Sequence, residues 1–392
     1  MIKPFQFTRL PLIIFGNGKV SELPGLIKRY GKRALLVTGK TSFEKTSAAI
    51  RFFETAKTEG FDLNVLSIKG EPSDRIIDEA SSVYRNDPPD IVVAIGGGSA
   101  IDAGKAISAM IPVQGKIKDF LEGVGHKDHP GNKIPLIAVP TTSGTGSEAT
   151  KNAVISRVGK EGFKKSLRHD NFVPDIALVD PELTLSCPQS ITAASGMDCF
   201  TQLIEAYLSL KSNEYTDALA FEGLKAVKSY LIRTYRDGKD IEARSGMSFA
   251  ALTSGICLTN AGLGVVHGFA SSVGGLYDIP HGIVCGTLMA VSNELTVRRL
   301  REIPGSVTAM KKYVLLAKLF LDDPGGLNGD QMIDGFIEYL HNLTEELQLP
   351  GLKTAGISEN DLLEIAAATE CKNNPVKLTT SDLSEILQKR YI

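Results

Sequence analysis

Short apolar runs alternate with stretches of helical spacing through the first half of this chain. The runs predict strands at Ala34–Thr38, Leu63–Ile68, Ile91–Ile95, Pro135–Val139 and Ile176–Val179. Between the first three runs, residues 42–59 and 73–85 have apolar positions spaced three and four apart, which predicts helices. This alternation is typical of a parallel or mixed sheet covered by helices.

The second half of the chain follows the helical period almost throughout. Clear examples are Thr201–Leu210, Thr216–Tyr235 and Met332–Glu345. The pattern changes near Asp180-Pro181-Glu182-Leu183, and a chain of 392 residues is long for one ordinary core. We therefore predict an α/β domain at residues 1–183 and an all-helical domain at residues 184–392.

A glycine-rich turn follows the third predicted strand. Gly96, Gly97 and Gly98 end the apolar run, and Ser99 is predicted to cap a helix with Asp102 in its first turn. Glycines let a backbone approach an anion closely, and the N–H groups and dipole of a helix N-terminus bind it. The turn therefore predicts a phosphate site, although a tight turn without a ligand has the same sequence.

A second polar loop, Pro140–Glu148, follows the fourth predicted strand. Its hydroxyl side chains suit contacts to a pyrophosphate, a ribose or an amide. These hydroxyls belong to Thr141, Thr142, Thr145 and Ser147. A polar surface loop is the alternative. Because ligands of open α/β sheets bind beyond the carboxyl ends of strands, two such loops together favour a nucleotide site. The glycines do not match G-x-G-x-x-G, so a standard Rossmann fold is not favoured.

Candidate metal ligands occur in the helical half. Asp198 and Gln202 are four residues apart and would share one helix face. His267 and His281 are each followed by glycine in apolar sequence. Each histidine alone fits a hydrogen-bonded core position, but one carboxylate with two imidazoles suits Fe²⁺, Zn²⁺ or Mn²⁺.

Charge and cysteine content restrict the classes of partner. The net charge is −2 and no basic block is present, so we expect no nucleic-acid partner. No apolar run reaches the ~20 residues of a membrane span, and the N-terminus has no signal pattern, so we expect a cytoplasmic protein without a membrane partner. The five cysteines form no C-x-x-C pair, which argues against disulfides and a thiolate zinc site and predicts small buried residues. They are Cys187, Cys199, Cys257, Cys285 and Cys371.

Together these motifs resemble the iron-containing (group III) alcohol dehydrogenase family. The resemblance covers most of the chain and depends on Gly96–Lys105, Pro140–Glu148, Asp180–Thr184, Gly196–Asp198 and Pro280–Gly282. It implies an α/β dinucleotide-binding domain followed by an all-α metal-binding domain, the fold shared with dehydroquinate synthase. A dehydroquinate-synthase-like lyase is therefore a rival, which the Pro140–Glu148 loop disfavours.

The resemblance also implies roles for individual residues. Gly96–Ser99 would bind the pyrophosphate of NAD or NADP, and the second loop would contact the rest of the dinucleotide. Lys164, or alternatively Lys165, would lie near the nicotinamide ribose. The divalent metal, Fe²⁺ or Zn²⁺, would be held by Asp198, Gln202, His267 and His281.

Three positions depart from the family pattern. Gln202 stands where the family usually has a metal-binding histidine, so the metal could be held by the other three ligands alone. Ser271 stands where many members have another histidine. Gly39 stands where NAD-preferring members have an aspartate, which would repel a 2′-phosphate, so use of NADP is expected to be possible.

The sequence therefore predicts a metal-dependent NAD(P)-linked alcohol dehydrogenase or aldehyde reductase. Asp198, His267 and His281 would be its catalytic residues, and its substrate would be a small alcohol or aldehyde. We expect the protein to form a homodimer or a larger homo-oligomer. A divergent member acting on glycerol, on a sugar-acid alcohol of the 3-deoxy-octulosonate type, or on maleylacetate without metal is the first alternative. A non-catalytic nucleotide-binding protein is the second.

Overall fold

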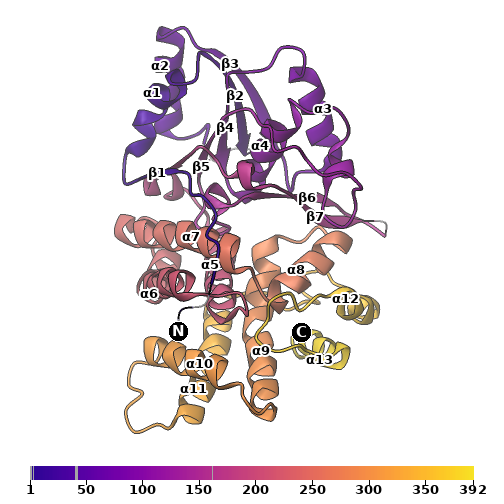
Figure 1. Cartoon of the computed structure of the whole chain (residues 1–392). Coiled ribbons are helices and arrows are strands. Elements are labelled where there is room, and N and C mark those ends of the chain that lie inside the picture. Colours follow the sequence, from indigo (N-terminus) through magenta and orange to yellow (C-terminus); the bar gives the residue numbers. More distant parts are fainter. Residues whose placement is uncertain (1, 3, 40–42, 161) are drawn as a thin grey trace.

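A six-stranded parallel sheet forms the N-terminal half of the computed structural model, which describes residues 2, 4–39, 43–160 and 162–392 (Figure 1). Its strands lie in the order β1-β8-β5-β4-β2-β3. They are β1 Leu12–Phe15, β2 Arg33–Gly39, β3 Asp62–Ile68, β4 Ile91–Gly96, β5 Leu136–Pro140 and β8 Ile176–Val179. The central strands β4 and β5 are buried at every position, which explains their continuous apolar sequence.

Helices cover both faces of this sheet (Figure 1). One face packs on α1, Leu23–Lys28, and α2, Ser47–Thr58. The other packs on α3, Asp74–Tyr84, and α4, Gly98–Met110. The predicted α/β architecture is thus confirmed, and the sheet is parallel rather than mixed.

The strand order places a topological switch beside the glycine turn. From β2 the chain moves outward to β3, and then returns past β2 to pair β4 on its other side. The order β3-β2-β4-β5-β8 is that of a doubly wound sheet, in which ligands bind where neighbouring crossovers diverge. Gly39 ends β2 and Gly96 ends β4, so both glycines flank this point.

The predicted elements are shifted by a few residues at their ends. The helix expected at 42–59 is α2, Ser47–Thr58, and its expected first residue, Ser42, lies outside the described residues. The hairpin β6–β7, Asn152–Arg157 and Phe163–Arg168, was not predicted, nor was the edge strand β1.

The C-terminal half is helical and has its own apolar core (Figure 1). Its helices are α5 Gln189–Leu208, α6 Glu214–Arg236, α7 Ile241–Ala261, α8 Val265–Leu276, α9 His281–Glu302, α10 Val307–Phe320, α11 Gly329–Glu346, α12 Leu362–Ala368 and α13 Thr380–Lys389. The proposed division at residue 183 falls in a single 3₁₀ turn, Pro181–Thr184, between β8 and α5.

A small apolar cluster joins the two halves. Ala149 and Val179 from the sheet side pack with Leu252 and Ile256 of α7. Within the described ranges no single helix is long and apolar enough to cross a membrane. Only α7 and α8 taken together pass by length and composition, and they are bent by 96° at their break.

Candidate functional site

The two polar loops lie side by side at the carboxyl ends of adjacent strands. Gly96 at the end of β4 pairs in register with Pro140 at the end of β5. The backbone N–H of Thr141 then donates to the carbonyl of Gly96 at 2.9 Å. The juxtaposition expected from the sequence is therefore present in the fold.

Glycine is required where these loops approach each other. A Cβ on Gly98 would lie 2.7 Å from Cγ2 of Thr145, and a Cβ on Gly97 would lie 3.3 Å from Oγ1 of Thr142. At Gly96, φ is +159° and a Cβ would lie 2.7 Å from that of Ala100. These glycines keep the backbone of the first loop against the hydroxyls of the second.

The capping prediction at Ser99 was wrong. Helix α4 begins at Gly98 with Gly97 as its N-cap, and no side chain of the described residues caps it. The first backbone N–H groups of a helix have no partner within the helix. Because Ser99 does not cap it, the N-terminus of α4 could accept an anion, and Gly97, Gly98 and Ser99 are all partly exposed.

Asp102 and Lys105 link α4 to the second loop. Asp102 accepts hydrogen bonds from the Ser147 hydroxyl and, at 2.9 Å, from the backbone N–H of Val154. The buried ammonium of Lys105 pairs with Asp102 at 3.2 Å and donates to the carbonyl of Ser147 at 2.9 Å. Both carboxylate oxygens of Asp102 are thus engaged inside the protein, as is the hydroxyl of Ser147.

Gly39 lies beside the glycine turn. A Cβ on Gly96 would approach within 3.1 Å of the backbone nitrogen of Gly39. Its neighbours Lys40 and Thr41 lie outside the described residues. The position where an acidic side chain would select NAD is therefore next to the proposed pyrophosphate turn, and it holds no side chain.

The structure separates the two candidate lysines. Lys164 on β7 is buried, forms an ion pair with Glu71 and lies so close to α8 that a Cβ on Gly274 would be 2.5 Å from its Cδ. Lys165 is exposed. Lys164 is therefore the lysine that faces the helical half.

Buried Glu148, in the second loop, makes the free energy of unfolding of the protein depend on pH. Burial raises the pKa of Glu148 from 4.5 to about 7. The folded chain therefore retains a proton that the unfolded chain loses, so its free energy of unfolding falls as pH rises from 4.5 to 7. The 2.5-unit difference (7 minus 4.5) corresponds to about 3 kcal/mol.

We predict that Glu148→Gln flattens this pH dependence. Between pH 4.5 and 8, denaturant unfolding should show the wild-type free energy of unfolding falling by about 3 kcal/mol more than that of the variant. Glu54→Gln, at an exposed position of α2, is the control and should follow the wild type. Parallel curves for Glu148→Gln and the wild type would refute the prediction.

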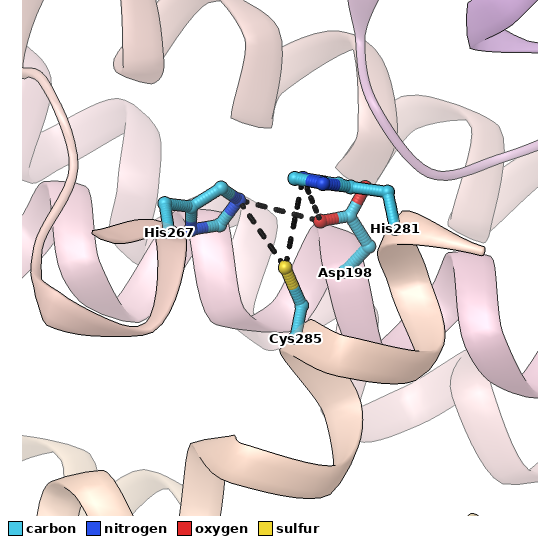
Figure 2. Close-up of side chains that lie close together, drawn as sticks. All are labelled: Asp198, His267, His281 and Cys285. Carbon is cyan, nitrogen blue, oxygen red and sulfur yellow. Dashed lines mark hydrogen bonds and ion pairs between the residues drawn. The ribbon is translucent and has the colours of Figure 1, made fainter. Parts of the chain in front are cut away.

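Four metal-binding side chains converge in the helical half (Figure 2). Asp198 comes from α5, His267 from α8, and His281 and Cys285 from successive turns of α9. One ligand atom from each lies within 4.8 Å of the other three. The structure thus brings together the three residues that the sequence singled out and adds Cys285.

Two glycines of α9 allow this convergence. A Cβ on Gly282 would lie 2.4 Å from the carbonyl oxygen of Ala194, and one on Gly286 would lie 2.9 Å from Cβ of Met197. Without side chains there, α9 packs directly on α5. His281 and Cys285, each one residue before a glycine, are thereby placed beside Asp198.

Glu205 orients His267. Its Oε2 lies 2.7 Å from Nδ1 of His267, and its Oε1 accepts the backbone N–H of Val266 at 2.7 Å. Because the carboxylate accepts the Nδ1 proton, Nε2 is the ring nitrogen that faces Asp198, 3.3 Å away. Glu205 follows Asp198 by seven residues on α5, and this spacing in an apolar helix was the signal that could have identified it.

Gln202 contacts the cluster through its amide nitrogen, and its amide oxygen bonds elsewhere. Its Oε1 accepts the Ser254 hydroxyl at 2.8 Å, and its Nε2 lies 3.4 Å from Oδ2 of Asp198. The opposite amide orientation would set an oxygen against this carboxylate, so the observed one is favoured. In this arrangement Gln202 presents its amide nitrogen to Asp198, and the expectation that it is a metal ligand stays a prediction.

Asp198 Oδ1 is one of two buried polar atoms of the site without a hydrogen bond to the described residues, and Nδ1 of His281 is the other. The Asp198 side chain is 2 % exposed, and its Oδ1 accepts no hydrogen bond from the described part of the chain although it faces both imidazoles. A buried carboxylate oxygen without a hydrogen bond is costly. A cation at this oxygen would remove the cost, so the donor set fits a divalent metal.

A metal ion and a proton compete for the ligand atoms of this cluster, so metal binding is favoured as pH rises. Burial lowers the pKa of His281 to about 3 and raises that of Cys285 to about 11. Burial also lowers the pKa of His267, but Cys285, Glu205 and Asp198 together raise it well above its usual value. A metal entering the cluster must displace the proton held there, so metal affinity should fall with decreasing pH.

Ser271 stands at the position where many members of the resembled family have a further histidine. Its hydroxyl donates to the carbonyl of His267 at 2.8 Å and lies 3.3 Å from Nζ of Lys372. Lys372 also donates to the carbonyl of His267, at 2.8 Å. These contacts brace the turn that carries His267.

Sequence comparison identifies relatives over almost the whole chain. Residues 11–181 match the family described as iron-containing alcohol dehydrogenase, and residues 192–391 match the C-terminal region of the Fe-containing alcohol dehydrogenase family. An NAD-dependent methanol dehydrogenase of Bacillus methanolicus is 29% identical over 96% of this chain and 97% of its own. An NADPH-dependent butanol dehydrogenase of Clostridium saccharobutylicum is 29% identical over 98% of each chain.

Structure comparison agrees. The crystal structure of a 1,3-propanediol oxidoreductase superposes with a TM-score of 0.88 and 27% identity, over 99% of this chain and 100% of that one. The predicted combination of an α/β half and a helical half is therefore confirmed as a known fold.

Proposed function

Because this chain belongs to the iron-containing alcohol dehydrogenase family, we propose that Asp198, His267 and His281 hold the catalytic metal of an NAD(P)-dependent alcohol dehydrogenase. The observation that carries the proposal is the buried, unsatisfied Oδ1 of Asp198, which lies 3.3 Å from Nε2 of His267 and 3.7 Å from Nε2 of His281. A carboxylate and two imidazoles converge there from three helices.

A divalent cation at these residues supplies Lewis acidity, which lowers the pKa of an alcohol hydroxyl and polarises a carbonyl in the reverse reaction. Glu205 binds Nδ1 of His267, so Nε2 is the nitrogen aimed at the centre. Gln202 holds Asp198 through Oδ2 and leaves Oδ1 free. His281, with a quarter of its side chain exposed (26%), forms the accessible side of the cluster, where a small alcohol or aldehyde would enter.

The two loops are proposed to hold the dinucleotide. Gly96–Ser99 and the N-terminus of α4 would bind the pyrophosphate, and Thr142 and Thr145 are the partly exposed hydroxyls facing it. Thr141, Asp102 and Ser147 are buried or bonded within the protein, so we assign them to positioning these loops.

Lys164 connects the proposed cofactor site with the metal cluster. Burial is the main cause of the low pKa of His281. Asp198 opposes it, and the positive charge of Lys164 lowers the pKa further, so Lys164 and His281 lie within electrostatic reach. This placement suits a lysine beside the nicotinamide ribose. The reaction is then transfer of a hydride from the carbinol carbon to nicotinamide C4, with loss of the hydroxyl proton.

Gly39 bears on the choice of dinucleotide. An acidic side chain at the end of β2 would repel a 2′-phosphate beside the switch point, and Gly39 provides none. We infer that this chain accepts NADP as well as NAD.

The alternative substrates divide by their need for metal. A metal-free maleylacetate reductase has no use for the convergent, buried ligands of this site. Glycerol and sugar-acid alcohols would use the same centre, so they belong in the substrate panel. The expected homodimer or larger assembly stays a prediction.

A substrate panel tests this function. Purified protein loaded with Fe²⁺ or Zn²⁺ should reduce both NAD⁺ and NADP⁺ with at least one of methanol, butanol, 1,3-propanediol, glycerol or a sugar-acid alcohol. Absence of turnover with every alcohol, and with the matching aldehydes and reduced cofactor, would overturn it.

Removing the partner of His267 should weaken metal binding. Glu205→Gln keeps the shape of the side chain but loses the charged acceptor for Nδ1, so we expect about a 10–100-fold loss of metal affinity. Titration with a competing chelator measures this change. Glu222→Gln, at an exposed position of α6, is the control and should bind metal like the wild type. An unchanged affinity in Glu205→Gln would show that this carboxylate does not orient the ligand.

A further inference from the structure

The proposed metal centre lacks one ligand at residue 202 and has a sulfur close by. The Gln202 amide oxygen is committed to Ser254. On α9, Sγ of Cys285 lies 3.7 Å from Nε2 of His267 and 3.6 Å from Nε2 of His281. Cys285 is fully buried, at 0% exposure, and its sulfur points at the two imidazoles and Asp198 (Figure 2).

The spacing of these atoms matches a tetrahedral cation site. Zinc binds sulfur at about 2.3 Å and nitrogen or oxygen at about 2.0–2.1 Å, so tetrahedral ligands would be separated by about 3.6 Å for N···S and about 3.4 Å for N···O. The N···S separations here are 3.7 and 3.6 Å, and the N···O separations are 3.3 and 3.7 Å. These four separations are close to ligand spacing, and all four atoms lie within 4.8 Å of one another.

A second observation points to a cation at that centre. Oδ1 of Asp198 is buried, accepts no hydrogen bond and faces the same space as the sulfur. Packing of a small cysteine would not by itself explain an unsatisfied carboxylate oxygen beside it. A cation bound to both atoms explains the two together.

We propose that Cys285 is the fourth metal ligand of this chain, in place of residue 202, and that the resulting Asp198–His267–His281–Cys285 site prefers Zn²⁺. The inference rests on the metal centre proposed above. Binding requires loss of the thiol proton to solvent, after which the carboxylate and thiolate together balance a divalent charge. Thiolates favour zinc over harder cations, and zinc sites expand to five-coordinate, so four protein ligands are compatible with catalysis.

The absorption spectrum of the cobalt-substituted protein tests this assignment. The full-length chain loaded with Co²⁺ should show a thiolate-to-cobalt charge-transfer band in the near ultraviolet. Cys285→Ser should abolish the band, whereas Cys257→Ser, another fully buried cysteine in α7, should retain it. X-ray absorption of the zinc-loaded chain should show one sulfur at about 2.3 Å.

A rescue variant separates ligation from packing. Cys285→Ser should weaken Zn²⁺ binding at least about tenfold, and Cys285→Ser with Gln202→His should restore affinity without the charge-transfer band. Circular dichroism confirms that each variant is folded.

The outcomes distinguish the two proposals. The role of Cys285 is overturned if the wild type binds stoichiometric metal but shows neither a sulfur ligand by X-ray absorption nor the thiolate-to-cobalt band. That result leaves the proposed metal centre intact. Failure of the wild-type chain to bind any divalent metal overturns both.

Discussion

Replacing Asp198 with asparagine should lower the rate of alcohol oxidation by about 10³-fold or more. The substitution keeps the shape of the side chain but removes the only carboxylate of the three proposed ligands. Metal-ion stabilisation of the reacting oxygen is worth several kcal/mol, and about 4 kcal/mol corresponds to a factor of 10³. Steady-state turnover and metal content measured on the same samples give the result.

Cofactor affinity provides the internal control for this variant. Asp198 lies on α5 and is not among the residues assigned to the dinucleotide, so NAD(P)H should bind Asp198→Asn nearly as tightly as it binds the wild type. Asp322→Asn, whose side chain is 99% exposed, should leave both rate and metal content unchanged. Full turnover in an Asp198→Asn sample shown to be metal-free would contradict the assignment.

Substituting Gly98 with valine should raise the dissociation constant of NAD(P)H by about 100-fold. A Cβ at this position would lie 2.7 Å from Cγ2 and 2.8 Å from Oγ1 of Thr145, so the two loops must move apart. Loss of two hydrogen bonds to the charged pyrophosphate, at about 1.5 kcal/mol each, corresponds to this factor. Fluorescence titration of the reduced cofactor measures it.

A matched glycine substitution tests whether the effect is local. Gly25 lies in α1 with no atom within 4 Å of an added Cβ, so Gly25→Ala should bind the cofactor normally. Metal content of Gly98→Val should also remain at the wild-type level. Normal cofactor affinity in Gly98→Val would show that the nucleotide binds elsewhere.

The sheet could be predicted from sequence because its strands are buried on both faces. Ile91–Gly96 and Leu136–Pro140 are continuous apolar runs ended by glycine or proline, and such runs are recognisable without knowing their partners. The adjacency of the two loops followed from one rule, that parallel strands end at the same edge.

The missed strands lack such a signal. β7, Phe163–Arg168, buries Lys164 and Leu167, which are three residues apart, so its sequence has no strand pattern and its pairing with β6 defines it as a strand. β1, Leu12–Phe15, is short and pairs with a strand more than 160 residues later in the chain. Pairing over such a separation depends on the whole fold and leaves no local pattern.

The metal site was only partly predictable for a related reason. Asp198, His267 and His281 were identified by type and by family resemblance, and the fold brings them together. Cys285 was expected to be a packing residue, because its distance from Asp198 depends on how closely α9 approaches α5. The orientation of Gln202 depends on Ser254, 52 residues away, and no spacing rule predicts that contact.

The central claim is that oxidation of an alcohol depends on the metal held by Asp198, His267 and His281. The direct test measures NAD(P)H formation by chelator-treated protein before and after a stoichiometric amount of Zn²⁺ or Fe²⁺ is added back. We predict that activity is lost with the metal and returns with it in the wild type, but not in Asp198→Asn. An undiminished rate in wild-type protein shown by elemental analysis to contain no metal would contradict the account.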